Sequence, residues 1–367
     1  MPDAAQRRVV TLVVAPLVAI GLGITAVALP VPYVEISPGK TCDALTHCND
    51  DANQILTISG PKQYATSGQL RLTTVSVRGG PGSKMTLFDA LRGWLDGKVA
   101  VLPRDITFPP GQSVDENNCQ NVIEQDESQN TATTAALRQL KYKVPVTKQV
   151  YIAQVGASGA AQRAGLDECD FIESVDGKKP KDTADLLALL QAHKPGDTVT
   201  IGYLRKMTDG KAEPDIKSVS VTLGADPANP SHALLGIKPA ETEVTHPPFK
   251  VSLYLGGVGG PSAGLMFALA IIDKLTPGAL PGGRIIAGTG TIDDAGAVGP
   301  IGGIQQKVFA AKSDGATVFL TPAQDCADAA RVHVKGIRLV SVDTLDGALS
   351  ALAVLRGEPG TLKDCHA

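Results

Sequence analysis

The stretch Gly259-Gly260-Pro261-Ser262-Ala263-Gly264 decides how the C-terminal part of this chain folds, because it separates two segments of different periodicity. Before it, Val251–Leu255 alternates as a strand does. After it, Leu265–Ile272 contains strong helix formers, and no helix breaker occurs before Pro277. We therefore predict a strand, a turn and a helix, with Ser262 at or near the helix N-terminus. Free N–H groups at that position favour a developing negative charge, which is what acyl transfer requires.

A serine hydroxyl needs a base before it becomes a good nucleophile. Lys307 is the candidate base, because Gly302-Gly303 opens a second predicted helix on which this lysine has apolar neighbours such as Val308 and Phe309. A lysine accepts a proton only when it is neutral. Its ordinary pKa of ~10.4 must therefore fall to roughly 7–8 through burial.

The segment Pro261-Ser262-Ala263-Gly264, followed by Pro300-Ile301-Gly302-Gly303-Ile304 and then Lys307, resembles the Ser–Lys proteolytic domain of the Lon family. The resemblance implies that Ser262 is the nucleophile, Lys307 the base and Thr289 the residue that orients the lysine. Gly259 and Thr291 depart from the family pattern, which often has acidic residues at these two positions. The dyad is expected to be intact, whereas the family's regulatory contacts are not expected to carry over.

The same turn also satisfies G-x-S-x-G, the nucleophile elbow of α/β-hydrolases. That interpretation needs an acid and a histidine downstream, and Asp325 or Asp328 with His333 are available. It also needs a long α/β run upstream, which the chain does not supply. A plain helix cap at Ser262 is the non-catalytic alternative. The lysine and threonine motifs both occur at the positions that the Lon resemblance requires, and this favours the Ser–Lys interpretation.

The N-terminus predicts a membrane anchor. Residues 9–29 carry no charge, are long enough to span a bilayer and follow Arg7 and Arg8. The positive flank predicts a cytoplasmic N-terminus and places the rest of the chain outside the cytoplasmic membrane. A cleaved signal peptide is the alternative, since Ala26-Val27-Ala28 reads as a cleavage site.

The cysteines and charges limit the chemistry. An even number of cysteines in an extracytoplasmic chain permits disulfides, and Cys42 and Cys48 are close enough to bridge. No zinc motif occurs, and the acidic cluster between Asp115 and Glu127 reads as solvated surface, so we expect no metal and no cofactor. A net charge of −3 argues against a nucleic-acid partner. The six cysteines are Cys42, Cys48, Cys119, Cys169, Cys326 and Cys365.

A second unit begins near residue 142. Predicted strands at 150–155, 171–178 and 198–205 alternate with a small-residue turn at 159–166 and a helix at 182–193. This order resembles a PDZ domain of the bacterial HtrA type, although Cys169 stands where such domains usually have Gly or Pro. The resemblance implies that an extended peptide adds to a sheet edge and that a loop grips its terminal carboxylate. We expect that loop near Tyr142-Lys143-Val144-Pro145.

These observations predict an α/β (α+β) Lon-type proteolytic domain and a β-rich PDZ domain, preceded by one N-terminal transmembrane helix. Residues 103–130 are expected to be irregular, and a helix is expected at 131–140. The predicted segments are a cytoplasmic N-terminus (1–8), a transmembrane anchor (9–29), a linker (30–53), a β-rich region that packs on the protease domain (54–140), a PDZ domain (142–224), a connector (225–248), a Lon-like proteolytic domain (249–355) and a C-terminal tail (356–367).

The predicted function is an ATP-independent serine endopeptidase with a Ser–Lys dyad, because the sequence contains no P-loop motif. Its expected partners are protein or peptide substrates, a PDZ-bound peptide and the cytoplasmic membrane. Assembly into a homo-oligomer stays open. A catalytically silent PDZ scaffold is the alternative from a different class.

Overall fold

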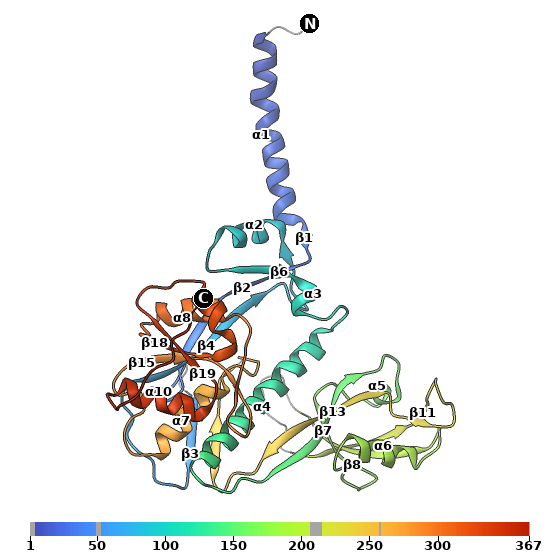
Figure 1. Cartoon of the computed structure of the whole chain (residues 1–367). Coiled ribbons are helices and arrows are strands. Elements are labelled where there is room, and N and C mark those ends of the chain that lie inside the picture. The colour runs from blue at the N-terminus through green and yellow to red at the C-terminus, as the bar shows by residue number, and fades with distance from the viewer. Residues whose placement is uncertain (1–3, 49–52, 206–214, 257, 367) are drawn as a thin grey trace.

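The structure is a computed structural model that describes residues 4–48, 53–205, 215–256 and 258–366 (Figure 1). The first three residues of the predicted cytoplasmic segment 1–8 lie outside these ranges. The helices are α1 (Ala4–Ala28), α2 (Leu87–Leu95), α3 (Arg104–Thr107), α4 (Val114–Gln139), α5 (Ala160–Arg163), α6 (Thr183–Gln191), α7 (Gly264–Leu275), α8 (Ile304–Ser313), α9 (Cys326–Ala330) and α10 (Leu345–Leu355). The strands are β1 (Pro30–Val31), β2 (Tyr33–Asp43), β3 (Leu56–Ser59), β4 (Gln69–Arg78), β5 (Met85–Thr86), β6 (Ala100–Pro103), β7 (Val146–Val155), β8 (Asp170–Val175), β9 (Thr198–Arg205), β10 (Lys217–Thr222), β11 (Gly224–Ala225), β12 (Ala233–Leu234), β13 (Ile237–Thr245), β14 (Lys250–Leu253), β15 (Ile285–Gly288), β16 (Thr291–Ile292), β17 (Val298–Gly299), β18 (Val318–Pro322) and β19 (Arg338–Val342).

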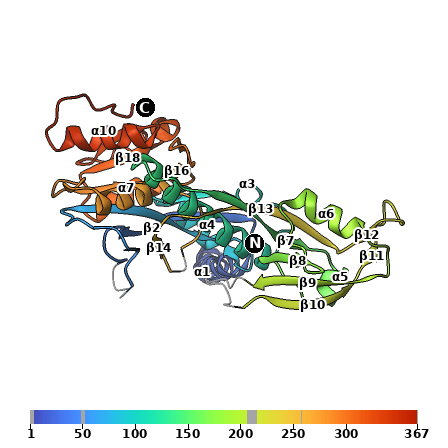
Figure 2. The ribbon, with the colours of Figure 1, turned by 90° about the horizontal axis from the view of Figure 1, so that it is seen from below.

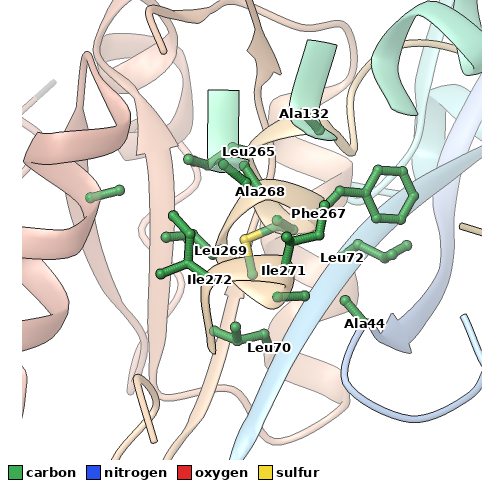
Figure 3. Packing of buried hydrophobic residues seen from close by; sticks show 14 of the residues in the cluster. Ala44, Leu70, Leu72, Ala132, Leu265, Phe267, Ala268, Leu269, Ile271 and Ile272 are labelled. Carbon is green, nitrogen blue, oxygen red and sulfur yellow. The ribbon is translucent and has the colours of Figure 1, made fainter. Parts of the chain in front are cut away.

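A six-stranded mixed sheet forms the larger body, in the order β19-β18-β15-β4-β2-β6. The strands from β19 to β4 run parallel, and β2 is antiparallel to both β4 and β6. Because side chains alternate along a strand, one face packs against α7 and α10 and the other against α8 and α9. Helix α7 is buried along almost its whole length, between the sheet and α4 (Figure 3). Leu70 and Leu72 of β4 and Ala132 of α4 surround it there.

The predicted linker at 30–53 is wrong, because residues 33–43 form β2 inside this sheet. Pro30, Pro32 and Pro38 favour an unpaired linker, because a proline has no N–H to donate to a neighbouring strand. The sheet accommodates Pro38 where the register between β2 and β4 shifts, between Pro38 and Thr41.

The predicted irregular segment at 103–130 is also wrong over most of its length. Helix α4 runs unbroken from Val114 to Gln139. Its start is stabilised by a capping box in which Ser113 and Glu116 satisfy each other's backbone N–H groups. Most of its buried residues are small or polar, such as Ser128, Ala132 and Thr133, and only Val122, Ile123 and Leu137 of the buried set are large and apolar, which is why the sequence lacks a strong helical stripe.

The second body is a five-stranded antiparallel sheet in the order β10-β9-β8-β7-β13. Its outer strand β13 lies within the predicted connector at 225–248, which is therefore partly wrong. β13 pairs with β7 along its whole length and shifts register at Pro239. Viewed from below, this body and the six-stranded sheet lie on opposite sides of α4 (Figure 2). Helix α4 packs against both β13 and α7.

The cysteines form the pairs Cys42–Cys48, Cys119–Cys169 and Cys326–Cys365. The second pair joins α4 to the loop before β8. The third holds the C-terminal tail against α9. Pairs two and three could not be chosen from spacing alone.

Helix α1 projects from the body and contains Pro16 (Figure 1). Over the residues that the structure describes, no helix combines the length and the apolar character needed to cross a membrane, so the predicted transmembrane anchor at 9–29 is not supported.

Candidate active site

Ser262, Thr289 and Lys307 lie together beside the N-terminus of α7. Lys307 Nζ is 2.7 Å from Ser262 Oγ and 3.1 Å from Thr289 Oγ1. The Thr289 hydroxyl also donates a 2.9 Å hydrogen bond to the carbonyl oxygen of Ser262. Three segments far apart in the sequence supply these groups: the turn before α7, the residue after β15 and the first turns of α8. The sheet brings them together, because α7 packs on β4, β15 is the neighbour of β4, and α8 packs on β4 and β2 from the opposite face.

Burial is the dominant influence on Lys307. Its side chain is 2% exposed, and Thr289 is fully buried. Removal from water disfavours the ammonium form and lowers the pKa of Lys307 from its ordinary value to about 7, although the charge of Asp325 acts in the opposite direction. A lysine with this pKa is substantially neutral near neutral pH and can accept a proton from Ser262.

Helix α4 supports the turn that carries Ser262. Ser128 donates a 3.0 Å hydrogen bond to the carbonyl oxygen of Pro261, and the N–H of Gly260 points to the carbonyl of Asn121 at 3.4 Å. Gly264 lets the turn approach closely, since a Cβ there would lie 2.9 Å from Ile292 Cγ2. The sequence motif identified the turn but not α4 as its support.

The same contact accounts for the unusual Gly259. A Cβ at this position would lie 2.8 Å from Asn121 Cβ, so an acidic side chain would force α4 away from the turn. The departure from the usual Lon pattern at Gly259 is therefore matched to the position of α4.

Backbone N–H groups are available for an oxyanion. Within the described part of the chain, the N–H groups of Ser262 and Ala263 donate no hydrogen bond, while that of Gly290 is occupied by the Ser262 carbonyl. They lie at the N-terminal end of α7, where the helix dipole favours negative charge. An oxyanion formed next to Ser262 could accept from them.

The serine–histidine alternative does not assemble. His333 is exposed in the turn after α9, and among the described residues the hydrogen bond of Ser262 Oγ is to Lys307. Asp325 accepts a 2.9 Å hydrogen bond from the N–H of Ile301, and Asp328 pairs with Arg331. Neither aspartate orients His333. Among the described residues, no group of three His, Cys, Asp or Glu side chains could hold a metal ion.

A second candidate site lies on the five-stranded sheet, between α6 and the outer edge of β13. A cavity of about 110 Å³ opens there, and Leu186 and Leu190 of α6 face Leu235 and Ile237 across it. Within the described residues, the N–H groups of Leu235 and Gly236 donate no hydrogen bond, and Gly236 has a φ of +81°. A free sheet edge, an apolar cavity and unpaired N–H groups are what a peptide C-terminus needs.

Residues 142–145, where the carboxylate-binding loop is expected, do not line this cavity. Tyr142 follows the end of α4 and packs edge-to-face on Phe249, with ring centroids 5.2 Å apart. The N–H groups of Leu235 and Gly236 that line the cavity lie directly before β13. Their sequence signal is the apolar–Gly–apolar segment Leu235-Gly236-Ile237, which lies inside the predicted connector at 225–248.

Comparisons with known proteins match both bodies. Residues 125–216 match the model of the PDZ domain, and residues 256–354 match that of the Lon protease (S16) C-terminal proteolytic domain. Over 70 residues the chain is 43% identical to the serine protease Do-like HtrA of Lactobacillus helveticus, covering 19% of this chain and 17% of that protein. Over 99 residues it is 35% identical to Lon protease 3 of Sorangium cellulosum, covering 26% of this chain and 12% of that protein.

A solved PDZ domain of an SdrC-like protein from Listeria innocua is 28% identical, with a TM-score of 0.21, and the match covers 25% of this chain and 92% of that one. The chain thus spans less than a fifth of the length of the curated HtrA and Lon proteins described above. The two family matches do not overlap and are separated by residues 217–255. The chain therefore contains a PDZ domain and, after it, a proteolytic domain of the Lon (S16) family of Ser–Lys serine proteases.

Proposed function

We propose that this protein is an ATP-independent serine endopeptidase in which Ser262 is the nucleophile and Lys307 the general base. The observation that carries the proposal is the 2.7 Å approach of Lys307 Nζ to Ser262 Oγ, with the lysine almost fully buried. The absence of a P-loop motif from the sequence supports independence from ATP.

In this mechanism Ser262 Oγ attacks the carbonyl carbon of the scissile peptide, and its proton passes to the neutral Lys307 amine. The carbonyl oxygen becomes an oxyanion that accepts from N–H groups at the start of α7. As the C–N bond breaks, the Lys307 ammonium returns the proton to the leaving amine, and an acyl ester remains on Ser262. Water then attacks this ester, again giving a proton to Lys307, which returns it to Ser262.

The PDZ domain is assigned the selection of substrates. A peptide C-terminus would pair with the free edge of β13, place its last side chain in the 110 Å³ cavity and direct its carboxylate to the N–H groups of Leu235 and Gly236. A cavity of this size suits one small aliphatic side chain. The proposed substrates are therefore proteins or peptides with an apolar C-terminal residue.

The proposed location is the outer face of the cytoplasmic membrane. Arg7 and Arg8 before the uncharged residues 9–29 support export across that membrane. The pairing of all six cysteines supports an oxidising compartment. In intact cells, protease added outside should digest the bulk of the chain, and a thiol reagent should label it only after reduction. Full protection from the external protease would contradict this location.

The test of activity is a fluorophosphonate probe combined with a fluorogenic peptide. The full chain should be labelled at Ser262 and should hydrolyse the peptide, whereas Ser262→Ala and Lys307→Met should each lose nearly all turnover. The double variant should be no worse than either, since the pair acts as a unit. His333→Ala is the control and should keep activity.

Three results would decide against the proposal. Turnover retained by a folded Lys307→Met variant would remove the lysine from the reaction. Loss of turnover in His333→Ala would revive the serine–histidine mechanism. An unlabelled and inactive but folded wild-type chain would favour the silent PDZ scaffold.

A further inference from the structure

Helix α2 has its apolar side turned away from the protein. Its buried residues are the small Ala90 and Gly93, and a Cβ on Gly93 would lie 2.6 Å from Val101 Cγ2. A surface helix of a globular protein ordinarily buries its large apolar side chains. Apart from the half-buried Leu87, the large apolar side chains of α2 are exposed: Phe88 at 52%, Leu91 at 46%, Trp94 at 53% and Leu95 at 89%.

The exposed apolar residues form one surface. Phe88, Leu91 and Leu95 recur at helical spacing along one face, and Trp94 lies beside Leu91 around the helix. The Trp94 ring meets Tyr33 edge-to-face, with centroids 5.5 Å apart, which holds it in place. We call these four residues of α2 the α2 apolar face. Contiguous exposed apolar surface of this kind marks an interaction site.

The α2 apolar face adjoins the end of α1. The N–H of Leu87 donates a 3.0 Å hydrogen bond to the carbonyl of Leu29, and β1 pairs with β5 immediately before α2. Figure 1 shows α1 projecting from the body and α2 lying across its base. Along α1 the exposed apolar side chains include Leu12, Leu17, Ile20, Leu22 and Val27. The two helices thus present adjoining apolar surfaces at one end of the molecule.

The composition of this end fits a lipid surface. Phe, Leu and Trp on one side of a helix with cationic side chains nearby are typical of helices that lie in the membrane interface. Lys84, Arg92 and Lys98 are exposed beside the α2 apolar face. Tryptophan prefers the boundary between the headgroups and the acyl chains. The capping box of Thr86 and Asp89 satisfies the helix start without help from a partner protein.

We propose that α2 docks on the membrane–water interface and holds the catalytic body against the lipid surface. This inference rests on the proposed membrane location and is independent of protease activity. The partner is the lipid surface itself, contacted by the α2 apolar face with its axis along the bilayer.

The single tryptophan of the chain, Trp94, makes this testable in the intact protein. The full chain is reconstituted in vesicles of phosphatidylcholine and phosphatidylglycerol, with or without bromine on the upper acyl carbons. We expect the brominated lipid to remove roughly half of the Trp94 emission, because an interfacial helix buries its apolar face about 5–10 Å deep. Acrylamide dissolved in the water should quench the Trp94 emission of the vesicle-bound protein less than that of unfolded chain without lipid.

A matched control places the tryptophan at a different position in the chain. The C-terminal end of α4 lies at the end of the body opposite α1 (Figure 1), and Tyr142 follows it and is 38% exposed. In a Trp94→Phe, Tyr142→Trp variant, brominated lipid should have no effect on the emission. A Leu91→Glu, Leu95→Glu variant should remain vesicle-bound through α1 but lose the lipid quenching of Trp94, while its peptide hydrolysis in detergent stays unchanged.

Vesicle-bound protein whose Trp94 is open to acrylamide and insensitive to bromine would overturn the inference and leave the membrane location standing. Trp94 shielded from both quenchers, with cross-links between copies through α2, would assign the face to a second copy and also overturn it. Failure of the chain to float with the vesicles would overturn the inference together with the proposed location. None of these results bears on the Ser–Lys dyad, which is assayed separately.

Discussion

At the scale of single residues, Lys307 combines burial with the removal of its positive charge. The amine is held by Ser262 and Thr289 and, within the described part of the chain, is not paired directly with a carboxylate, so burial is the largest influence on its pKa. An ammonium group in the same place would lose its hydration without a full partner. The neutral base is therefore a product of the fold.

The pH dependence of peptide hydrolysis should follow Lys307. Because the neutral amine is the active form and its pKa is lowered to about 7, kcat/KM should rise with pH through a limb near 7 and level off above it. Asp325 favours the ammonium form, so Asp325→Asn should move the limb to lower pH. The measurement is a pH–rate profile of the full chain on a peptide that does not itself titrate. A limb near the ordinary lysine pKa would contradict this assignment.

Stability should show the same titration with a known sign. Between about 7 and the ordinary value of 10.5, the unfolded chain binds a proton at Lys307 that the folded chain does not. The free energy of unfolding should therefore rise with pH across that window. Below it the folded chain also carries the proton, so the full cost of burying the ammonium group is present. In denaturant unfolding, the free energy of unfolding of the wild type should increase relative to that of Lys307→Met between pH 7 and 10. Parallel pH profiles for the two proteins would contradict the lowered pKa.

Thr289 should act by positioning the lysine. Thr289→Val keeps the shape but removes the hydroxyl that meets Lys307 Nζ and the Ser262 carbonyl. Loss of a buried hydrogen-bond partner costs about 1–3 kcal/mol, which corresponds to a fall in kcat of roughly 5- to 150-fold. Thr289→Ser retains the hydroxyl and should recover most of the activity. An unchanged pH limb together with unchanged kcat in Thr289→Val would show that the hydroxyl is dispensable.

At the scale of elements, α4 connects the two bodies. Its N-terminal half is joined to the PDZ domain by Cys119–Cys169, and Ser128 and Asn121 contact the turn that carries Ser262. The residues of α4 that face α7 are small, which allows the two helices to pack closely. Movement of α4 would therefore displace the nucleophile turn.

Ser128→Ala tests this support. The change removes the hydrogen bond to the Pro261 carbonyl and should lower kcat several-fold, with little effect on KM for a short peptide. Thr133→Val is the matched control, because Thr133 carries a buried hydroxyl on the same helix and, among the described residues, donates its hydrogen bond to the carbonyl of Gln129. Equal effects of the two variants on kcat would mean that α4 stability, and not the turn, is what Ser128 provides.

At the scale of the whole molecule, the cavity between α6 and β13, called the PDZ groove below, lies in a different body from the dyad. Figure 2 shows α6 and β13 on the other side of α4 from α7. The groove and the dyad can thus be altered separately. Selection of a substrate by its C-terminus and cleavage at an internal bond are compatible with this separation.

Groove binding is measured on the full Ser262→Ala chain with a fluorescent peptide ending in valine. The free carboxylate should bind roughly tenfold or more tightly than the amide, since hydrogen bonds to charged groups contribute about 1.5–3 kcal/mol. Leu187→Glu, which alters an exposed residue of the groove, should weaken binding, whereas Ile216→Glu, exposed in the same domain but outside the groove, should not. Equal affinity for acid and amide would contradict a carboxylate-binding loop.

The sequence alone determined the features whose causes are local. The Gly-Pro turn and the helix formers after it place Ser262 before α7, and the Gly-Gly turn places Lys307 early on α8. The periodicity of 182–193 determines α6, which the structure has at Thr183–Gln191. These features depend on backbone freedom, capping and side-chain period within a few residues.

Only the tertiary structure decided the features whose stabilising contacts are distant in sequence. β4 enters the six-stranded sheet by pairing with β15, and β2 enters it by pairing with β4. β13 completes the PDZ sheet by pairing with β7. α4 has few large apolar residues, so its packing on α7 leaves no strong stripe in the sequence. The lowered pKa of Lys307 has the same origin, because it needs three remote segments to exclude water around one amine.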